Sequence, residues 1–191
     1  MKYYLVLLVL ISSSLVQADG VKLSCSPEET QCINCPEYQT LFNIEEFSKD
    51  TGSLDIESDS SEIVSDKYLL NGNVEVNSDS LFLAADEVEI STVDNSLLAS
   101  GDVRFQDQSY LITSDLLSAT RDENDKLTAT AKNAKYQDFA AGLGGANGYT
   151  EIISKTPTTV LLTNTTYSLC PVNKNDWLID ADQIELNLVK N

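Results

Sequence analysis

A repeat of 29 residues constrains the fold of this chain more than any other sequence feature. Residues 70–76 (LNGNVEV) and 99–105 (ASGDVRF) share a Gly-x-Val core, with Gly72 and Gly101 at equivalent positions. One such unit cannot bury its apolar residues alone, whereas stacked units share a continuous interior. The repeat therefore predicts a stack of similar units. The same offset pairs four further residues of the two copies: Leu81 with Tyr110, Leu83 with Ile112, Asp86 with Asp115, and Val88 with Leu117.

Alternation of apolar and polar residues within each copy predicts β-strands. Val74 and Val76, for example, alternate with asparagine and glutamate. A period of two over about four to eight residues is typical of half-buried strands. A weaker third copy begins at Asn133, a partial fourth begins at Leu162, and residues 54–59 look like the end of an earlier copy. Because no helical periodicity is sustained beyond the first segment, the sequence predicts an all-β fold built from repeated antiparallel strand pairs.

The first 18 residues predict that the chain is exported. Lys2 precedes an apolar run, and Val16 and Ala18 suit the −3 and −1 positions of a signal-peptidase site. The run is shorter than the roughly 20 residues of a membrane-spanning helix. A membrane anchor and a lipoprotein site at Cys25 are the alternatives. We divide the chain into a signal peptide (1–18), a polar, cysteine-containing lead (19–53) and a repeat domain (54–188).

Export makes the four cysteines candidates for disulfides. Cys32 and Cys35 form a C-x-x-C pair. This spacing also suits a thioredoxin-type redox pair, which needs a βαβ context that the sequence does not show, or a zinc site, for which no histidine is at hand. We therefore expect structural disulfides among Cys25, Cys32, Cys35 and Cys170. Because three of these lie near the N-terminus and one far away, we expect at least one long-range bridge, or a bridge to another chain.

Charge and composition narrow the functional classes. The chain has no histidine, which excludes Ser-His-Asp and Cys-His sites and histidine-rich zinc sites. With 30 acidic and 12 basic residues its net charge is −18, so sequence-independent binding to nucleic acid is not expected. Catalysis by carboxylates alone stays open, but a pair such as Asp55 and Glu57 carries little weight among so many acids. We expect neither an enzyme nor a cofactor.

One aspartate recurs at the same place in the repeat, as Asp86, Asp115 and Asp182. Carboxylates are calcium ligands, but a spacing of 29 residues matches no compact calcium-binding loop. Glycine and asparagine stand elsewhere in the units where the backbone needs a permissive residue. We therefore prefer a role for these aspartates at a turn or strand corner and predict no metal site.

The repeat resembles a known domain. Residues 70–74 (LNGNV), followed by 83–88 (LAADEV) and preceded by 54–59 (LDIESD), are similar to the OstA-like domain of lipopolysaccharide (LPS) transport proteins. Periplasmic bridge proteins and outer-membrane LPS-assembly proteins (LptD, or organic solvent tolerance proteins) both carry this domain. The last third of the chain resembles the segment that closes the periplasmic domain in the second group. The residues that carry this likeness are Cys170, Pro171, Asp176 and Trp177.

The resemblance implies an open β-jellyroll, in which two facing antiparallel sheets bury apolar side chains. In the family a membrane β-barrel follows, so we expect the chain to be an N-terminal fragment. It would be exported to the periplasm and attached to the outer membrane through a barrel in the full-length protein. Cys170 matches the family's second periplasmic cysteine, which implies a bridge to a cysteine near the end of that barrel. The C-x-x-C pair is additional to the family pattern.

The resemblance also implies a groove for LPS. Because LPS headgroups are anionic and the chain is acidic, we expect binding through the acyl chains. For any single apolar residue, burial in a closed core is the simpler interpretation. The prediction of a groove applies to the row of residues as a whole. The residues assigned to this row are uncharged: Val74, Val76, Leu81, Leu83, Val88, Val103, Phe105, Tyr110, Ile112, Leu117, Tyr136, Val160, Leu162 and Ile179.

Three partners follow from the resemblance. They are LPS, the periplasmic LPS-bridge protein, and the outer-membrane plug lipoprotein, the last reached through the missing barrel. The bridge protein would join head to tail by edge-strand pairing through residues 54–76. Two alternatives remain. The chain could be a stand-alone bridge protein, although that group lacks the segment from Cys170 to Trp177, or a secreted structural β-repeat protein that binds no lipid.

Overall fold

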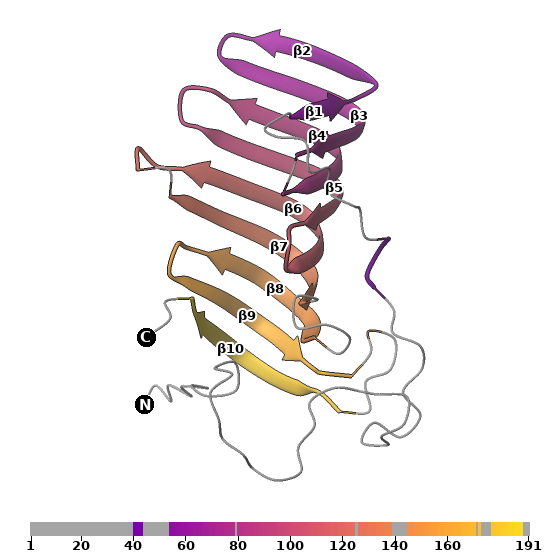
Figure 1. The fold of residues 1–191 in the computed structure, drawn as a ribbon, viewed down its shortest axis with the longest axis vertical. Coiled ribbons are helices and arrows are strands. Elements are labelled where there is room, and N and C mark those ends of the chain that lie inside the picture. The colour runs from indigo at the N-terminus through magenta and orange to yellow at the C-terminus, as the bar shows by residue number, and fades with distance from the viewer. Residues whose placement is uncertain are drawn as a thin grey trace.

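The computed structural model describes residues 40–43, 54–78, 80–124, 126–138, 145–170, 172 and 177–188. In this part of the chain ten antiparallel strands form one sheet, which confirms the predicted all-β fold (Figure 1). Among the described residues no helix is long and apolar enough to cross a membrane. The strands are β1 (Asp55–Glu57), β2 (Ser60–Val64), β3 (Lys67–Asn77), β4 (Phe82–Ser91), β5 (Ser96–Gln106), β6 (Tyr110–Arg121), β7 (Leu127–Asp138), β8 (Asn147–Lys155), β9 (Thr159–Tyr167) and β10 (Ile179–Asn187).

The sheet keeps the order of the chain. Its path runs β1-β3-β4-β5-β6-β7-β8-β9-β10, and β2 pairs with β3 beside β1. The first copy of the repeat is the hairpin β3–β4 and the second is β5–β6. The weaker copies are β7–β8 and β9–β10. The predicted repeat is therefore a stack of four hairpins along the long axis of the molecule (Figure 1).

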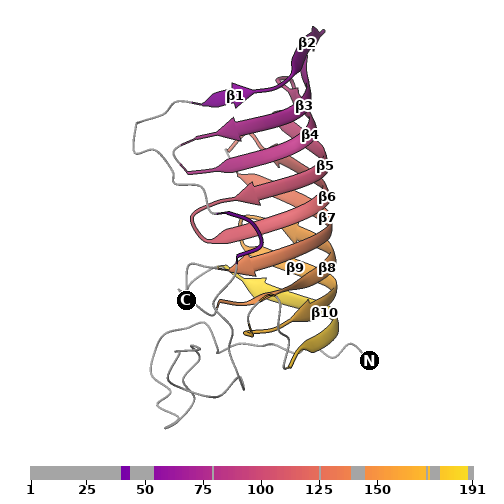
Figure 2. The ribbon, with the colours of Figure 1, turned by 90° about the vertical axis from the view of Figure 1, so that its right-hand side faces the viewer.

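Each long strand bends at its middle, where the repeat carries its permissive residues. Gly72 and Gly101 have φ angles of 76° and 74°, and Asn133 and Asn164 have φ angles of 51° and 48°. The pairing of β3 with β4, of β4 with β5 and of β5 with β6 shifts its register at the same level. The strands consequently fold over along one edge of the molecule, which we call the corner (Figure 2). The two facing sheets implied by the resemblance are two arms of one sheet.

Aspartates occupy the corner beside these residues. A Cβ atom at Gly72 would lie 2.9 Å from Asp59 Cβ, and one at Gly101 would lie 2.8 Å from Asp86 Cβ. Asp115 Oδ2 accepts a hydrogen bond of 2.7 Å from Asn133 Nδ2. Asp59 Oδ2 likewise accepts a hydrogen bond of 3.0 Å from Asn73 Nδ2. These contacts place Asp86 and Asp115 at the strand corner, as predicted. No cluster of three or more acidic or cysteine side chains that could hold a metal ion occurs among the described residues.

The corner divides the sheet into two arms (Figure 2). Arm A ends in the turns that join β4 to β5, β6 to β7, and β8 to β9, whereas arm B ends in the turns that join β3 to β4 and β5 to β6. Arm A comprises residues 67–71, 87–91, 96–100, 116–121, 127–132, 152–155, 159–163 and 183–187. Arm B comprises residues 74–77, 82–85, 103–106, 110–114, 134–138, 147–150, 165–167 and 179–181.

Part of the lead packs on the outside of arm B. The backbone N–H of Leu41 donates to Gln137 Oε1 at 2.9 Å, and the rings of Phe42 and Phe82 lie 6.5 Å apart. Because Gln137 lies on β7 and Phe82 on β4, residues 40–43 cross several strands. This contact was not predicted. Most of the outward positions buried on this arm form one row, the outer row, consisting of Phe82, Gln106, Leu111, Gln137, Asn147 and, beside it, Ser168.

Candidate functional site

All the residues predicted to line the groove lie on one face of the sheet. The register places Val76 beside Leu83, Leu83 beside Phe105, and Phe105 beside Ile112. Ile112 in turn lies beside Tyr136. Directly opposed residues of antiparallel strands point to the same side. Between the two arms this side forms what we call the inner face. The predicted row is therefore a spatial row, whereas its contact with lipid remains a prediction.

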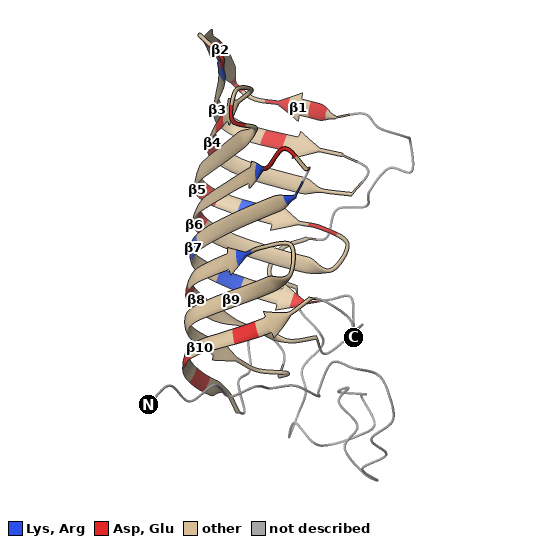
Figure 3. Cartoon of the chain, turned by 90° about the vertical axis from the view of Figure 1, so that its left-hand side faces the viewer, with Lys and Arg blue, Asp and Glu red and all other residues tan. Residues whose placement is uncertain are grey.

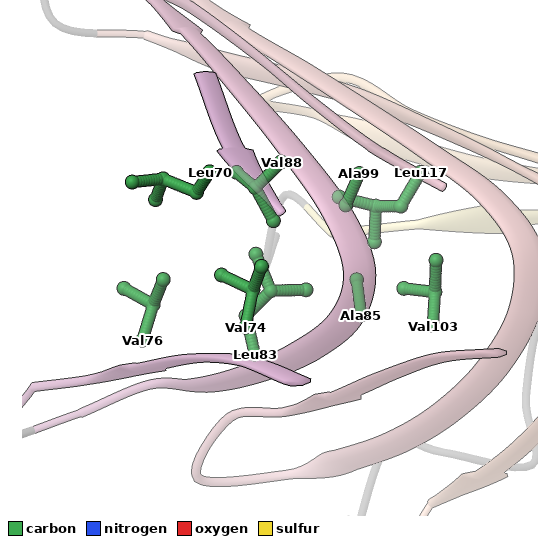
Figure 4. Close-up of a cluster of buried hydrophobic side chains, with 9 residues drawn as sticks. All are labelled: Leu70, Val74, Val76, Leu83, Ala85, Val88, Ala99, Val103 and Leu117. Atoms are coloured by element: carbon green, nitrogen blue, oxygen red, sulfur yellow. The ribbon is translucent and has the colours of Figure 1, made fainter. Parts of the chain in front are cut away.

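Near the corner the inner face is closed. Val74, Val88 and Val103 are 1 %, 1 % and 0 % exposed. Figure 4 shows that side chains of the two arms point toward one another here. Leu70 and Val88 of arm A, for example, face Val74 and Leu83 of arm B. These residues form a packed core, as the simpler interpretation of single positions predicted. The cluster contains Leu70, Val74, Val76, Leu83, Ala85, Val88, Ala99, Val103 and Leu117.

Away from the corner the inner face is less covered. Ile179 is 44 % exposed, and other predicted residues are half-buried. The half-buried members pack against the closed clusters with one side and leave the other side open. We call the strand ends that carry them the lips of the two arms. The lips therefore hold the part of the row that a ligand could reach: Leu81, Phe105, Tyr110, Ile112, Val160 and Ile179, with Ile90 and Leu97, which the sequence did not single out.

The second half of the inner face has smaller side chains and more polar ones. Its buried cluster consists of Ala131, Ala134, Tyr136, Ile153 and Leu162. The Tyr136 hydroxyl donates to the backbone carbonyl of Thr166 at 2.7 Å, and burial raises the pKa of Tyr136 to about 12. The alanines escaped the sequence analysis because their small side chains give a weak alternation signal.

Charged residues are nearly absent from the inner face. The register assigns three of them to inner-face positions within the described strands: Arg121, Asp138 and Lys155. Asp138 lies beside Tyr110 in the register. Burial, and next the negative charge of Asp138, raise the pKa of Tyr110. Apart from Asp138, the acidic residues of the described strands occupy corner positions or outer-face positions of the register, as Glu75 and Glu89 do. Figure 3 marks where acidic residues occur along the strands and turns.

The residues of the predicted family motif are only partly described. Cys170 is 1 % exposed, and its carbonyl accepts a hydrogen bond of 2.6 Å from Asn147 Nδ2. Trp177 is 40 % exposed, and its carbonyl accepts a hydrogen bond of 2.7 Å from Ser168 Oγ. Both ends of this segment therefore join the C-terminal end of the sheet. Pro171 and Asp176, as well as Cys25, Cys32 and Cys35, lie outside the described residues, so the disulfides remain a prediction.

Comparison with known proteins identifies one family. The family model "LptA/(LptD N-terminal domain) LPS transport protein" matches residues 55–191. The LPS-assembly protein LptD of Shewanella frigidimarina is 28 % identical over 97 % of this chain and 24 % of its own length. That of Idiomarina loihiensis is 27 % identical over 85 % of this chain and 21 % of its own length. The chain thus spans about a quarter of the length of these curated relatives.

A solved structure is also similar. It is LptH of Pseudomonas aeruginosa, described as the LptA homologous periplasmic component of the lipopolysaccharide transport device. The similarity covers 73 % of this chain and 96 % of that one, with a TM-score of 0.46 and 10 % sequence identity.

Proposed function

Because this chain belongs to the LPS transport protein family of LptA and the LptD N-terminal domain, we propose that its inner face holds the acyl chains of LPS while the lipid passes along the sheet. The observation that carries this proposal is the row of half-buried, uncharged residues at the lips, next to a closed core at the corner. The core holds the sheet in shape without ligand, and the lips offer apolar surface.

Energetics support an apolar groove. Transfer of an acyl chain into water costs about 0.8 kcal/mol per CH₂, so a chain of about twelve carbons costs on the order of 9 kcal/mol. LPS carries several such chains. An apolar surface that runs from strand to strand removes most of this barrier, and no chemical step is required. We accordingly propose no catalytic role for the chain.

Transfer needs a neighbour from which LPS is received, and among the described strands both ends of the sheet have an open edge. β1 and β2 are exposed along their whole length, with Ile63 66 % exposed. We propose that a bridge protein of the same family pairs with these two strands. The expectation that this edge extends to Val76 is wrong, because β3 is an interior strand that pairs with β1 or β2 on one side and with β4 on the other.

Site-specific photo-crosslinking in the exported chain tests the lipid groove. A photoreactive amino acid at Phe105 or Ile112, which are half-buried at the lips, is expected to attach covalently to LPS. The same amino acid at Arg104 or Asp102 is expected not to, because Arg104 points to the outer face and Asp102 lies at the corner, and both are exposed. Attachment at all four positions, or at none, would refute the groove.

The edge is tested in the same way. A photoreactive amino acid at Ile63 should capture the bridge protein in cells, whereas one at Asn71 should not, because Asn71 pairs with Ser60 in the interior of the sheet. Capture from Asn71 but not from Ile63 would overturn the assignment of β2 as the docking edge.

The alternative is a structural β-repeat protein with a closed core throughout. The tight packing of Val74, Val88 and Val103 favours it for the corner. It makes the opposite prediction for the lips, because a closed core leaves no room for an acyl chain at Phe105 or Ile112. The lipid crosslinking experiment therefore decides between the two functions.

A further inference from the structure

Lys155 is an unusual residue for its place in the sheet. It is the last residue of β8 and lies on the inner face, two positions after the buried Ile153. The register sets it between Ala129 on β7 and Val160 on β9. Its side chain is half-buried, and this side chain makes no hydrogen bond or ion pair with any described residue. A cation thus stands at the lip of a face that is otherwise almost uncharged.

The aliphatic stem of a lysine covers apolar surface while its ammonium reaches water. At Lys155 this geometry directs the ammonium to the rim of arm A. An amphiphile whose chains lie on the inner face would place its headgroup at the same rim. A positive charge there suits an anionic headgroup, even though the chain as a whole carries a net charge of −18.

A pocket lies close to this rim, between the β6–β7 and β8–β9 turns, and has a volume of about 480 Å³. Lys155 does not line it, but the next residue, Thr156, does. A volume of this size is in the range of small-molecule sites. The side chains that line it include Arg121, Lys126, Thr128 and Thr158. They are donors that suit phosphate oxygens and sugar hydroxyls.

Among the described residues that line the pocket, one carries a carboxylate. Asp122 Oδ1 accepts hydrogen bonds of 2.9 Å from the backbone N–H groups of Asn124 and Lys126. These backbone hydrogen bonds lower the pKa of Asp122 below its usual value, so the group is ionised at neutral pH. Its negative charge offsets one of the two cations of the pocket. It supplies an acceptor for hydroxyl groups of a sugar, so the pocket suits a sugar phosphate better than a bare anion.

From this geometry we propose that the tips of the β6–β7 and β8–β9 hairpins bind the phosphorylated sugar headgroup of the lipid, with Lys155 as the anion-binding side chain. This proposal rests on the proposed lipid groove and adds a polar site at its rim. It separates two tasks: the inner face binds apolar chains, and one rim of arm A fixes the position of the headgroup.

The test uses the exported chain with the photoreactive amino acid at Phe105 and compares Lys155→Glu with Lys132→Glu. Lys132 makes the matched control because it is exposed on the outer face of the neighbouring strand β7. The probes are LPS and the same LPS after its headgroup phosphates have been removed. With intact LPS at low salt, Lys155→Glu is expected to lower the crosslinking yield about fivefold, and high salt to weaken this effect. With dephosphorylated LPS, Lys155→Glu and the unaltered protein should give equal yields.

Inorganic phosphate distinguishes a headgroup site from a site for free anions. If the sugar contributes, millimolar phosphate added to the unaltered protein should leave the LPS yield unchanged. Equal loss in Lys155→Glu and Lys132→Glu, or equal loss with both lipids, would overturn the proposal and leave the groove intact. Displacement by phosphate would overturn the sugar part. Absence of crosslinking in the unaltered protein would instead refute the groove itself, and the headgroup site with it.

Discussion

Substitution of Gly101 by alanine tests whether the corner of the sheet is built as described. Gly101 has a φ angle of 74°, a conformation that L side chains rarely adopt. An added Cβ would stand 2.8 Å from the Cβ atom of Asp86, much closer than two carbon atoms pack. Since the Cβ of Asp86 is fixed to the backbone of β4, rotation of the side chain cannot relieve this contact. The two strands must move apart at the bend.

Two effects contribute to the cost. A non-glycine residue held at a positive φ costs about 1–2 kcal/mol, and overpacking typically costs about 1–3 kcal/mol. Replacing the flexible glycine also restricts the unfolded chain, which stabilises the folded protein by somewhat less than about 1 kcal/mol. We therefore expect Gly101→Ala to lower the free energy of unfolding by about 2–4 kcal/mol. Urea denaturation of the exported chain, followed by circular dichroism, measures this difference.

A double-mutant cycle separates the two contributions. Asp86→Gly removes the Cβ atom that the new methyl group would meet, so the pair should show a favourable coupling of about 1–2 kcal/mol when combined with Gly101→Ala. The part due to the φ angle should persist. If Gly101→Ala alone changes the unfolding free energy by less than about 0.5 kcal/mol, the reasoning on the corner is refuted.

Three further predictions concern single side chains. The buried Ser114 Oγ has no hydrogen-bond partner within the described residues, and the repeat places Ala85 at the equivalent position. Ser114→Ala should therefore raise the unfolding free energy, by up to about 1 kcal/mol in urea denaturation. Above pH 10 an unfolded Tyr136 ionises while the folded one, with a pKa of about 12, stays neutral. The protein should thus lose about 2–3 kcal/mol of stability as the pH rises from 10 to 12, and Tyr136→Phe should abolish this part of the loss in pH-dependent denaturation. Phe42→Ala removes the ring contact with Phe82 and should lower the unfolding free energy by about 1–3 kcal/mol.

Matched substitutions make these results interpretable. Tyr149 is 43 % exposed, so Tyr149→Phe should leave the alkaline loss of stability in place. Leu54 is 59 % exposed, so Leu54→Ala should change the stability far less than Phe42→Ala does. Equal effects of Leu54→Ala and Phe42→Ala would contradict packing of residues 40–43 on arm B. A loss of stability in Ser114→Ala would show that its hydroxyl is hydrogen-bonded.

Much of the fold could be predicted because the apolar residues that recur in the repeat are also those that alternate with a period of two, and both patterns mark the inner face. Val74 and Val103 stand at equivalent positions of two copies and are both buried in the corner cluster. The recurrence of Asp86 and Asp115 was correctly assigned to a strand corner. Alternation alone could not show that the two facing layers are one sheet. Glycine and asparagine occur both at bends within a strand and at turns between strands, so these residues do not distinguish the two.

The outer row could not be predicted from alternation, because a period of two describes a strand with one buried face. Phe82 and Leu111 break that pattern, since each stands between apolar residues that point inward. Uninterrupted apolar runs such as LFLAA at 81–85 indicate burial on both faces and could have revealed a covering segment. Lys155 gave no signal, because a serine and a lysine after two isoleucines are typical of the exposed end of a strand.

The corner has to be tightly packed and the lips have to stay accessible, and each hairpin of the repeat contains both. A groove for lipid must stay open without ligand, so its shape has to come from residues that the ligand does not touch. In this chain the positive φ angle at Gly101 and the packing of Val103 lie at the corner, whereas Phe105, two residues further along the same strand and the same face, lies at the lip. The length of the inner face grows with each added hairpin, and within the described strands neither end of the sheet pairs back on the other. A neighbour that adds a strand at β1 or β2 therefore extends the inner face without any change at the corner.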